Sequence, residues 1–565
     1  MESSALRASL ADDPELGAGN VLMKLAEHGA PPSLPGITFD VAVDGLPAWT
    51  PLPLGVLHER VAARAAWLHQ LGVRPRDPVA VFVTSAADCL LTFLALNWVG
   101  AIPALMNGNM PPDIAAGFIQ RLRGTALLAD AAHLTPLAGH DLGVAITADV
   151  AGAGSADPAA APPHYRYADS DPIAITHSSG TTRTPAAVVH SHSSLFAATR
   201  ELRLCGPRAH GPERILSALP AAHTAGILTL HQALVRSSEL LFLSAQGGLA
   251  PGEPGPARAA RNGETSSGFT GSGSVVLDAI ERWHPTAVYG FAVTWAELAR
   301  FDLTERDLGS VSVWFNTGDC AHEAHIRPLV AVGSHAEYTS DGLVRKPGSR
   351  FIDGIGSTEM GYSGFRISHH AGSSRYGRCV GKPHLFADVT LFDLATGRQT
   401  PVGEVGHLGL KSPTLALGYW NDSVTTYRTR FRGYYLTGDL MYRDEEGYYY
   451  HVDRAVDSVD LGGGNWLYTA MSEERILASC PDVRDCTVVA GRSGGNVVTD
   501  VLLLLKAGAD QQAGRGEAVK AALGAPAAAT LRRIVAVPDD QMVFGPTGKV
   551  RKFLMRQRHL ENAPA

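Results

Sequence analysis

A short loop rich in hydroxyl residues and glycine, SSGTT at 178–182, separates two apolar runs of the chain, 172–176 and 186–189. Glycine lets the backbone approach a ligand closely, and the hydroxyl and N–H groups of such a turn can donate to a phosphate. The lysine that the Walker motif requires after its glycines is missing. Because such a cluster on its own is usually a plain turn, its interpretation depends on the motifs that follow it.

Composition and charge limit the kinds of partner that the chain can have. Its 565 residues include 48 Lys and Arg and 55 Asp and Glu, which gives a net charge of −7. This balance offers no basic surface to nucleic acid or to an anionic membrane. The six cysteines show no CxxC spacing, which suits a reducing compartment. The polar N-terminus does not resemble a signal peptide, and the longest apolar run, 89–106, contains Asn97, Gly100 and Pro103. We therefore expect a cytoplasmic protein with no nucleic-acid or membrane partner.

Apolar runs of strand length alternate with helix-like runs from Leu54 onward, which predicts an α/β fold. The run from Leu54 to Gly72 has helical spacing, and the run that begins at Cys89 is typical of a buried helix leading into a strand. Alternating strands and helices indicate parallel, doubly wound sheets. The expected strands are 78–83, 101–105, 125–128, 144–148, 215–219, 286–291 and 311–316, and further helices are expected from about Ser193, from Ile227, over 274–283 and over 294–301.

The pattern changes beyond Gly377, where short alternating runs at 388–392, 407–411, 434–436 and 447–452 predict a β-rich part. The C-terminal residues predict helices at 471–479, 515–522 and 551–558 and strands at 484–490, 497–505 and 531–536. The fold class is therefore α/β. A large N-terminal domain of doubly wound α/β subdomains plus a β-rich subdomain is expected over residues 1–453, and a small, mobile α+β C-terminal domain over 454–565. Two segments lack periodicity: residues 1–45, expected as a surface arm, and residues 245–273, expected as a mobile surface insertion.

Seven short motifs follow one another in an order that resembles a known family. The sequence is similar to adenylate-forming enzymes, the superfamily of acyl-CoA synthetases, adenylation domains and luciferases, and the similarity covers essentially the whole chain. Each motif alone is weak, but their common order and spacing make the resemblance specific. The motifs are SSGTT at 178–182, PxxHxxG at 220–226, GSTE at 356–359, YLTGDL at 435–440, DR at 453–454, LGGGN at 461–465 and PTGKVRK at 546–552.

The resemblance implies that a carboxylate attacks the α-phosphorus of ATP with the help of Mg²⁺, so the charges of two anions must be neutralised. Thr358 would donate to the α-phosphate, and Glu359 would help to hold Mg²⁺. Asp439 would accept hydrogen bonds from the ribose hydroxyls, Arg454 would reach the ribose or phosphate, and Lys549 would bridge the substrate carboxylate and the α-phosphate. Without the other motifs, Asp439 and Arg454 would be read as a surface salt bridge and Lys549 as an exposed turn lysine. The remaining nucleotide-binding residues implied by the resemblance are Ser178, Ser179, Gly180, Thr181, Thr182, Arg183, Asp353, Gly354, Ile355, Gly356 and Ser357.

The resemblance also bears on the acid that is activated. Amino-acid-activating relatives carry an Asp near Ala222, whereas this chain has Ala222-His223, and its GIGSTEM stretch resembles benzoate ligases. The implied substrate is therefore a small non-amino carboxylic acid, either aryl, alicyclic or acyl. His223 would line the acyl pocket or the thiol tunnel as part of the catalytic set, with a core histidine as the alternative. The stretch 289–291, YGF, is compatible with a pocket wall and with plain core packing.

A second half-reaction would transfer the acyl group to a thiol. The LGGGN motif resembles the loop that brings a glycine, here Gly463, to the pantetheine tunnel, although a glycine-rich hairpin is the plain alternative. The chain is thus interpreted as an ATP-dependent carboxylic acid–CoA ligase that uses ATP, Mg²⁺ and coenzyme A. Two alternatives stay open: a ligase that loads the phosphopantetheine of a carrier protein, and a degenerate member that performs only thioester formation or ligand binding.

The chain departs from the family pattern at three places. The phosphate loop has Arg183, Ala186 and Ala187 around Pro185 where relatives have glycine and then Pro-Lys-Gly, so a phosphate-binding lysine is missing. Ile355 stands where an aromatic residue commonly stacks on adenine. Val456 occupies the usual hinge position after the arginine of the DR motif.

Overall fold

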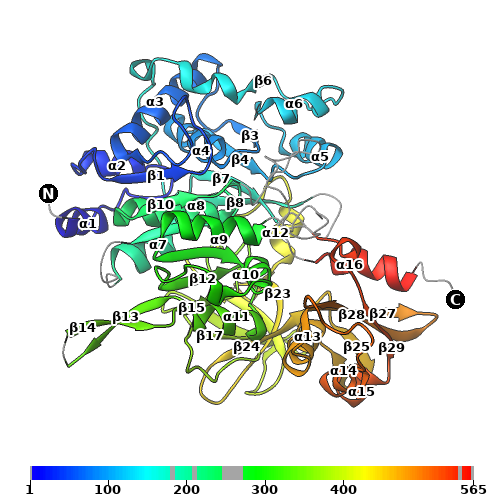
Figure 1. The fold of residues 1–565 in the computed structure, drawn as a ribbon. Coiled ribbons are helices and arrows are strands. Elements are labelled where there is room, and N and C mark those ends of the chain that lie inside the picture. The colour runs from blue at the N-terminus through cyan, green and yellow to red at the C-terminus, as the bar shows by residue number, and fades with distance from the viewer. Residues whose placement is uncertain are drawn as a thin grey trace.

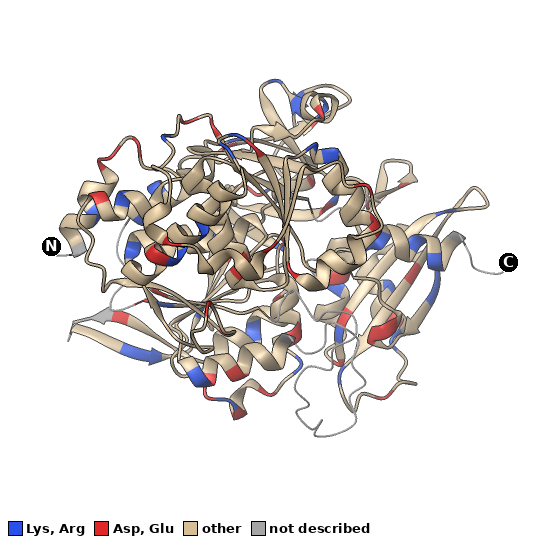
Figure 2. Ribbon diagram, turned by 90° about the horizontal axis from the view of Figure 1, so that it is seen from above, with Lys and Arg blue, Asp and Glu red and all other residues tan. Residues whose placement is uncertain are grey.

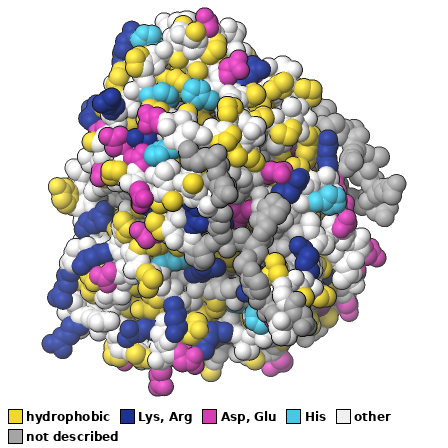
Figure 3. Space-filling model, turned by 90° about the vertical axis from the view of Figure 1, so that its left-hand side faces the viewer, with side chains coloured by type: hydrophobic (Ala, Val, Ile, Leu, Met, Phe, Trp, Pro, Cys, Tyr) yellow, Lys and Arg dark blue, Asp and Glu magenta, His cyan; other side chains and the backbone are white. Residues whose placement is uncertain are grey.

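The structure is a computed structural model of the chain, and it describes residues 3–178, 185–206, 213–244, 272–340, 342–544 and 550–561. Two large sheets with their helices form the greater part of the molecule, and a smaller group of C-terminal elements lies at one side (Figure 1). Within the described residues, no helix is long and apolar enough to cross a membrane. Acidic and basic residues are interspersed along the ribbon (Figure 2), and hydrophobic side chains are scattered among charged ones on the face that lies at the left of Figure 1 (Figure 3).

The first sheet joins seven of the described strands in the order β21-β8-β7-β4-β3-β5-β6. Its five strands from β7 to β6 are parallel, whereas β8 pairs antiparallel with β7 on one side and with the edge strand β21 on the other. The strands are β3 (Pro78–Phe82), β4 (Ile102–Met106), β5 (Ala126–Ala129), β6 (Ile146–Asp149), β7 (Pro172–His177), β8 (Ala187–Ser191) and β21 (Gly418–Tyr419). The helices α3 (Leu54–Gln70), α4 (Ala86–Val99), α5 (Pro112–Leu122) and α6 (Ala131–Leu137) alternate with these strands, which confirms the predicted α/β pattern here.

Helix α4 shows how local sequence sets these elements. Ser85 caps its N-terminus by accepting hydrogen bonds from the N–H groups of Ala87 and Asp88, and the helix ends at Gly100, whose φ is 79°. Its residues are buried all round, and the chain turns directly into the buried strand β4. The prediction of a buried helix that leads into a strand is therefore confirmed.

The second sheet contains both the remaining parallel strands and the β-rich part. Hydrogen bonding joins 15 described strands, and the antiparallel pairing of β15 with β16 connects the two parts without a break. The parallel strands are β1 (Pro35–Phe39), β10 (Glu239–Phe242), β9 (Arg214–Ser217), β11 (Ala287–Phe291), β12 (Val313–Thr317) and β15 (Arg350–Asp353). The others are β2 (Leu52–Pro53), β16 (Phe365–His369), β17 (Cys379–Pro383), β18 (Asp388–Asp393), β19 (Arg398–Gln399), β20 (Gly406–Lys411), β22 (Arg430–Phe431), β23 (Tyr434–Arg443) and β24 (Tyr449–Arg454).

Helices pack beside this second sheet. They are α8 (Thr224–Arg236), α9 (Ser272–Trp283), α10 (Ala292–Leu298) and α11 (Glu323–Ala331). Helix α7 (Ser194–Thr199), which continues as a π-helical turn (Arg200–Leu204), contacts α8 and β8 of the first sheet, and α12 (Ser423–Arg428) contacts β21 and β22. A hairpin of β13 (Ser334–Thr339) and β14 (Gly342–Pro347) extends away from the body (Figure 1). The expected insertion at 245–273 lies outside the described residues except for its last two positions, which begin α9.

The N-terminal segment is not the surface arm that was predicted. It forms α1 (Ser3–Ala11), α2 (Val21–Glu27) and β1, and β1 pairs in parallel with β10. Leu10 is fully buried, and Phe39 is 1% exposed. The prediction was wrong because these helices are only two to three turns long, too short for their apolar spacing to stand out from the polar residues between them.

The C-terminal elements form a third, three-stranded sheet with its own apolar core around Leu477, Val488, Val501 and Val519. The elements are β25 (Val459–Gly462), β26 (Asn465–Leu467), α13 (Thr469–Ser479), β27 (Val483–Ser493), β28 (Asn496–Leu505), α14 (Gly516–Leu523), α15 (Ala525–Ala528), β29 (Leu531–Ala536) and α16 (Lys552–Arg556), which continues as a π-helical turn to Glu561. The predicted order of C-terminal helices and strands is confirmed. The division of the chain at 453–454 stays a prediction.

Candidate active site

A cleft of about 530 Å³ opens where parallel strands of the second sheet end. Leu219 follows β9, Phe291 and Thr317 are the last residues of β11 and β12, Ile355 follows β15, and all four line the cleft. Ligands of open α/β sheets bind at this carboxyl end of the strands. The N-terminus of α8, at Thr224, reaches the same cleft.

The two ends of the expected phosphate loop meet at the cleft. The N–H of Ser178 donates to the carbonyl of Ala186 at 2.9 Å, and Ser178 Oγ accepts from the N–H of Ala186 at 3.1 Å. Both residues line the cleft. The residues between them that were assigned to phosphate binding lie outside the described residues, so their contacts stay a prediction: Ser179, Gly180, Thr181, Thr182 and Arg183.

The turn after β15 presents a carboxylate to the cleft. Ile355, Gly356, Ser357, Thr358 and Glu359 all line it. The hydroxyl of Tyr419, on the edge strand β21 of the first sheet, donates to Glu359 Oε1 at 3.1 Å. Burial and the neighbouring carboxylate raise the pKa of the Tyr419 hydroxyl, which therefore keeps its proton as a donor. The contact fixes Glu359 between the two sheets, and a half-buried carboxylate in this place fits Mg²⁺, which prefers oxygen ligands.

Asp353 and Gly354, which were also assigned to the nucleotide, are not among the described residues that line the cleft. Asp353 is 2% exposed and accepts from Asn316 Nδ2 at 2.6 Å and from the N–H groups of Gly354 and Ala321 at 2.8 and 3.2 Å. Burial raises the pKa of this carboxyl to about 6, although these hydrogen bonds oppose the shift. Asp353 thus stabilises the start of the turn through hydrogen bonds on the side away from the cleft.

Asp439 and Arg454 face each other on neighbouring strands. They are register partners in β23 and β24, and Arg454 Nη1 lies 3.2 Å from Asp439 Oδ1. Burial alone would raise the pKa of Asp439, but Arg454 and His451 outweigh it and lower this pKa to about 2. Asp439 is therefore an ionised acceptor that lines the cleft, as binding to ribose hydroxyls requires.

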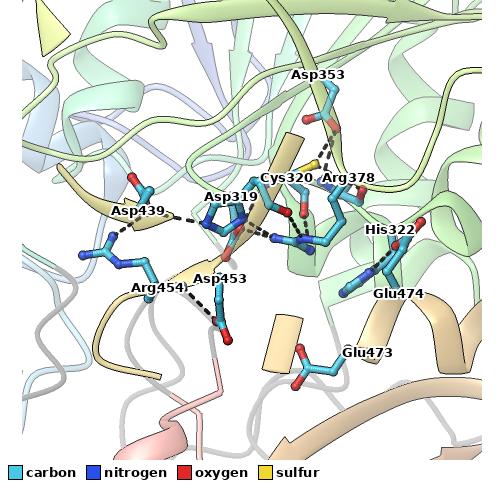
Figure 4. A network of polar contacts seen from close by, with 12 residues as sticks. Asp319, Cys320, His322, Asp353, Arg378, Asp439, Asp453, Arg454, Glu473 and Glu474 are labelled. Atoms are coloured by element: carbon cyan, nitrogen blue, oxygen red, sulfur yellow. Dashed lines mark hydrogen bonds and ion pairs between the residues drawn. The ribbon is translucent and has the colours of Figure 1, made fainter. Parts of the chain in front are cut away.

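A buried network lies behind Asp439 (Figure 4). Arg378 Nη2 donates to His451 Nδ1 at 2.7 Å, and Arg378 also lies 3.2 Å from Asp319. A guanidinium can only donate, so His451 Nδ1 must accept and the imidazole proton lies on Nε2. That atom is 3.6 Å from Asp439 Oδ1. The network orients Asp439, and no motif pointed to it because its members come from separate elements.

His223 lies in the cleft wall. As the N-cap of α8, it accepts from the N–H of Ala225 through Nδ1 at 3.1 Å, so Nε2 carries the proton of the neutral ring. Its ring meets Phe291 edge to face, with centroids 5.0 Å apart. Tyr289 also lines this part of the cleft.

The two functional positions assigned to the C-terminal part differ in what the structure describes. Lys549 lies outside the described residues, but Phe544 and Val550 on either side of it line the cleft and form a β-bridge. Gly463, with φ of 62°, lies at the tip of the β25–β26 hairpin and is not among the described lining residues. Its assignment to a thiol tunnel therefore stays a prediction.

Lys552, three residues after Lys549, has a different environment. Its ammonium lies 2.8 Å from Glu473 Oε1 and donates to Thr469 Oγ1 at 2.7 Å. Burial raises the pKa of Glu473, which Lys552 opposes. This pair holds the start of α16 against α13, a contact that the motif PTGKVRK did not reveal.

Comparisons with known proteins agree with this architecture. The family model described as AMP-binding enzyme matches residues 49–254 and 259–420. The chain is 39% identical to 3-aminoavenalumate diazotase of a Streptomyces species over 98% of this chain and 97% of that protein. It is 25% identical to the benzoate–CoA ligase of Thauera aromatica, over 86% of each chain. A crystal structure of the anthranilate CoA ligase AuaEII with anthranoyl-AMP superposes with a TM-score of 0.79 at 20% identity, covering 98% of this chain and 99% of that one.

The chain therefore belongs to the AMP-binding, adenylate-forming enzyme superfamily, and the predicted resemblance is confirmed. Its fold is a mixed α/β fold with large N-terminal sheets and a small C-terminal sheet, as in the ligase structure.

Proposed function

We propose that this protein is an ATP-dependent diazotase, which converts an aromatic amine that carries a carboxylate into a diazonium compound. The observation that supports this proposal most is the 39% identity to 3-aminoavenalumate diazotase along nearly the whole of both chains. The expectation of a non-amino acid rested on Ala222, and that position concerns an α-ammonium group, not an amine on an aromatic ring.

The chemistry requires a nitrogen at the oxidation level of nitrite. Nitrite presents an oxyanion like that of a carboxylate, so one oxygen can attack the α-phosphorus of ATP and displace pyrophosphate. The amine nitrogen then attacks the nitrosyl nitrogen. The bond between the nitrosyl nitrogen and the AMP oxygen breaks, AMP leaves, and the amine nitrogen loses a proton. The resulting N-nitrosamine takes up a proton and loses water to give the diazonium ion. No oxidant or reductant is needed.

The residues of the cleft have corresponding roles in this proposal. Asp439 accepts from the ribose hydroxyls, and Thr358 and Arg454 donate to the phosphates. Glu359 would hold Mg²⁺, which neutralises phosphate charge when bound. Lys549 contributes the cation where the oxyanion meets the phosphorus.

His223 acts beside the reacting amine. Because Nδ1 accepts from the N–H of Ala225, the proton of the neutral ring lies on Nε2. It therefore serves as a donor to oxygen in this half of the cleft.

The test uses the purified protein with ATP, Mg²⁺, nitrite and a set of amino-substituted aromatic acids at a pH above 7, where spontaneous diazotisation is slow. The diazonium ion is trapped as an azo dye with a naphthol, and AMP and pyrophosphate are measured in parallel. We expect dye formation to require both ATP and nitrite, with AMP formed in equal amount. Azo dye that forms without ATP, or no dye with any amine, would contradict the proposal.

The second candidate is an acid–CoA ligase, with loading of a carrier protein as its variant. The similarity to benzoate–CoA ligase and the glycine hairpin around Gly463 favour it. Mass spectrometry of reactions with aryl acids, ATP and coenzyme A or a carrier protein distinguishes it, because a thioester forms without nitrite. Formation of hydroxamate with hydroxylamine, but of no thioester, would instead indicate a member that only adenylates.

A further inference from the structure

Arg203 is not among the described residues that line the cleft, but it contacts two residues that do. It belongs to the π-helical turn Arg200–Leu204 that extends α7, a rare geometry that is frequent at functional sites. Its Nε donates to Gln232 Oε1 at 3.0 Å, and its Nη2 donates to the Tyr289 hydroxyl at 2.5 Å. Gln232 and Tyr289 both line the cleft.

These two contacts turn Gln232 and Tyr289 into hydrogen-bond donors. A guanidinium has no acceptor, so the side-chain oxygen of Gln232 must face Arg203 and its NH₂ group points elsewhere. The Tyr289 oxygen likewise accepts from Arg203, which leaves its own hydrogen to be donated. Burial and Glu213 raise the pKa of the Tyr289 hydroxyl, although Arg203 opposes the shift, so it keeps that hydrogen. This end of the cleft is therefore built to receive an acceptor group.

The surrounding charges add up to a positive site. Glu213 lies 3.9 Å from Arg203 and 3.4 Å from Arg236, so one carboxylate faces two guanidiniums. The Arg203 side chain is 17% exposed. Among the described residues of this cluster two guanidiniums face one carboxylate, and an anionic group of a substrate would balance the remaining positive charge in a poorly solvated place.

The site lies away from the nucleotide end of the cleft. Helix α8 begins at Thr224, whose hydroxyl is 3.0 Å from that of Thr176 on β7, two residues before Ser178. Gln232 is eight residues further along α8, which corresponds to about 12 Å of helix. A substrate anion at Gln232 would therefore direct the opposite end of the molecule toward the nucleotide.

We propose that Gln232 and Tyr289, oriented and polarised by Arg203, bind the carboxylate of the aromatic amine and so present its amine, not its carboxylate, to the nitrosyl group of the activated nitrite. The proposal rests on the proposed diazotase function, for which it specifies the substrate class and its orientation. Arg203 is a positioning residue and the specificity determinant for the acid group.

The experiment compares each amino aromatic acid with its primary amide, which has the same shape but no charge. We expect wild type to favour the acid about 10- to 100-fold in kcat/KM, the range of hydrogen bonds to charged groups. Arg203→Gln and Tyr289→Phe should each lose most of this preference, because kcat/KM for the acid falls while kcat/KM for the amide changes little. Arg203→Lys should restore part of it.

Arg214→Gln is the matched control, because Arg214 also pairs with a glutamate, Glu239 at 2.9 Å, but neither Glu239 nor Trp283, to whose carbonyl it donates at 2.7 Å, is among the described residues that line the cleft. It should keep the preference for the acid. Equal losses for acid and amide in both Arg203→Gln and Tyr289→Phe would overturn the proposal.

Calorimetric binding of the same acid and amide, without ATP or nitrite, separates this proposal from the diazotase function. Acid-selective binding that depends on Arg203 would support the anion site even if no diazonium forms. Diazonium formation with equal binding of acid and amide would refute the anion site alone.

Discussion

Arg454 Nη1 lies 3.2 Å from Asp439 Oδ1, and Arg454 is also the last residue of β24, directly before the segment that leads to the C-terminal sheet. The residue that lowers the pKa of Asp439, the proposed ribose acceptor, is therefore the residue at which the chain leaves the second sheet. A movement of the C-terminal elements about this point would change the environment of Asp439. If Asp439 binds the ribose, we expect nucleotide binding and the position of the C-terminal elements to be coupled through this ion pair.

The segment after Arg454 should act as a hinge between the two half-reactions. The N–H of Asp457 donates to the carbonyl of Arg454 at 3.0 Å, which closes a turn, and Val456 within it is 70% exposed. Proline is disfavoured at this third position of a turn, so Val456→Pro should restrict the change of backbone conformation that a rotation needs. We expect it to slow transfer from the adenylate several-fold more than adenylation, measured by single-turnover kinetics. Val456→Ala serves as the control, and equal slowing of both steps by Val456→Pro would argue against a hinge.

Lys549 should be needed for adenylate formation. Phe544 and Val550 on either side of it line the cleft, and a cation at the reacting phosphate stabilises the charge that develops there. Lys549→Ala should reduce exchange of pyrophosphate into ATP by about 10²- to 10³-fold. The exposed Lys506 provides a control, since Lys506→Ala should exchange at the wild-type rate. Wild-type exchange in Lys549→Ala would show that another cation serves the phosphate.

The buried carboxyl of Asp353 should give stability a specific pH dependence. Its pKa in the folded protein is about 6, above the ordinary 3.8, so the folded state holds this proton more tightly than the unfolded state. Its contribution to stability is therefore complete below about pH 4 and is lost as the pH rises toward 6. Relative to Asp353→Asn, wild type should lose up to about 3 kcal/mol of unfolding free energy over this range, measured by urea unfolding.

Asp439→Asn is the control for this pH dependence. The pKa of Asp439 is lowered to about 2, so its contribution is lost only as the pH falls below its ordinary value of 3.8. The difference between wild type and Asp439→Asn should therefore stay constant between roughly pH 4 and 6. A flat difference for Asp353→Asn over the same range would contradict the raised pKa.

Sequence reasoning found the parts of the site that are contiguous in the chain. The turn at 355–359 and the residues Asp439 and Arg454 lie in short motifs, and the structure brings them to one cleft. It did not find the triad of Arg203, Gln232 and Tyr289, because these residues come from a π-turn, a helix and a strand. Their relation exists only after folding, and no spacing in the sequence encodes it.

The fold shows the same limit. Long apolar runs such as that of α4 identified their elements correctly, since burial on all sides leaves a strong composition signal. The short N-terminal helices and the continuation of β15 into β16 depend on partners that are distant in sequence. Contacts between segments distant in sequence therefore determine these elements, and the local sequence pattern could not predict them.

The atypical phosphate loop gives the last prediction. Ala186 lines the cleft and its backbone is tied to Ser178, in a loop whose family pattern has a lysine that this chain lacks. Arg183 is the nearest cation in the sequence that could replace that lysine, and we expect it to do so, because Thr358, Glu359 and Asp439 are all retained. Arg183→Ala should then reduce adenylation by about 10²-fold, as the loss of one donor to a developing charge does elsewhere.

Ala186→Lys distinguishes this expectation from a loop that has lost its cation without replacement. If Arg183 serves the phosphates, Ala186→Lys should leave the rate of pyrophosphate exchange unchanged in wild type and should partly rescue Arg183→Ala. If no cation serves them, Ala186→Lys should accelerate exchange in wild type, and Arg183→Ala should have normal kinetics with ATP. The two hypotheses predict a different result for each single variant, so measuring both variants at saturating and limiting ATP decides between them.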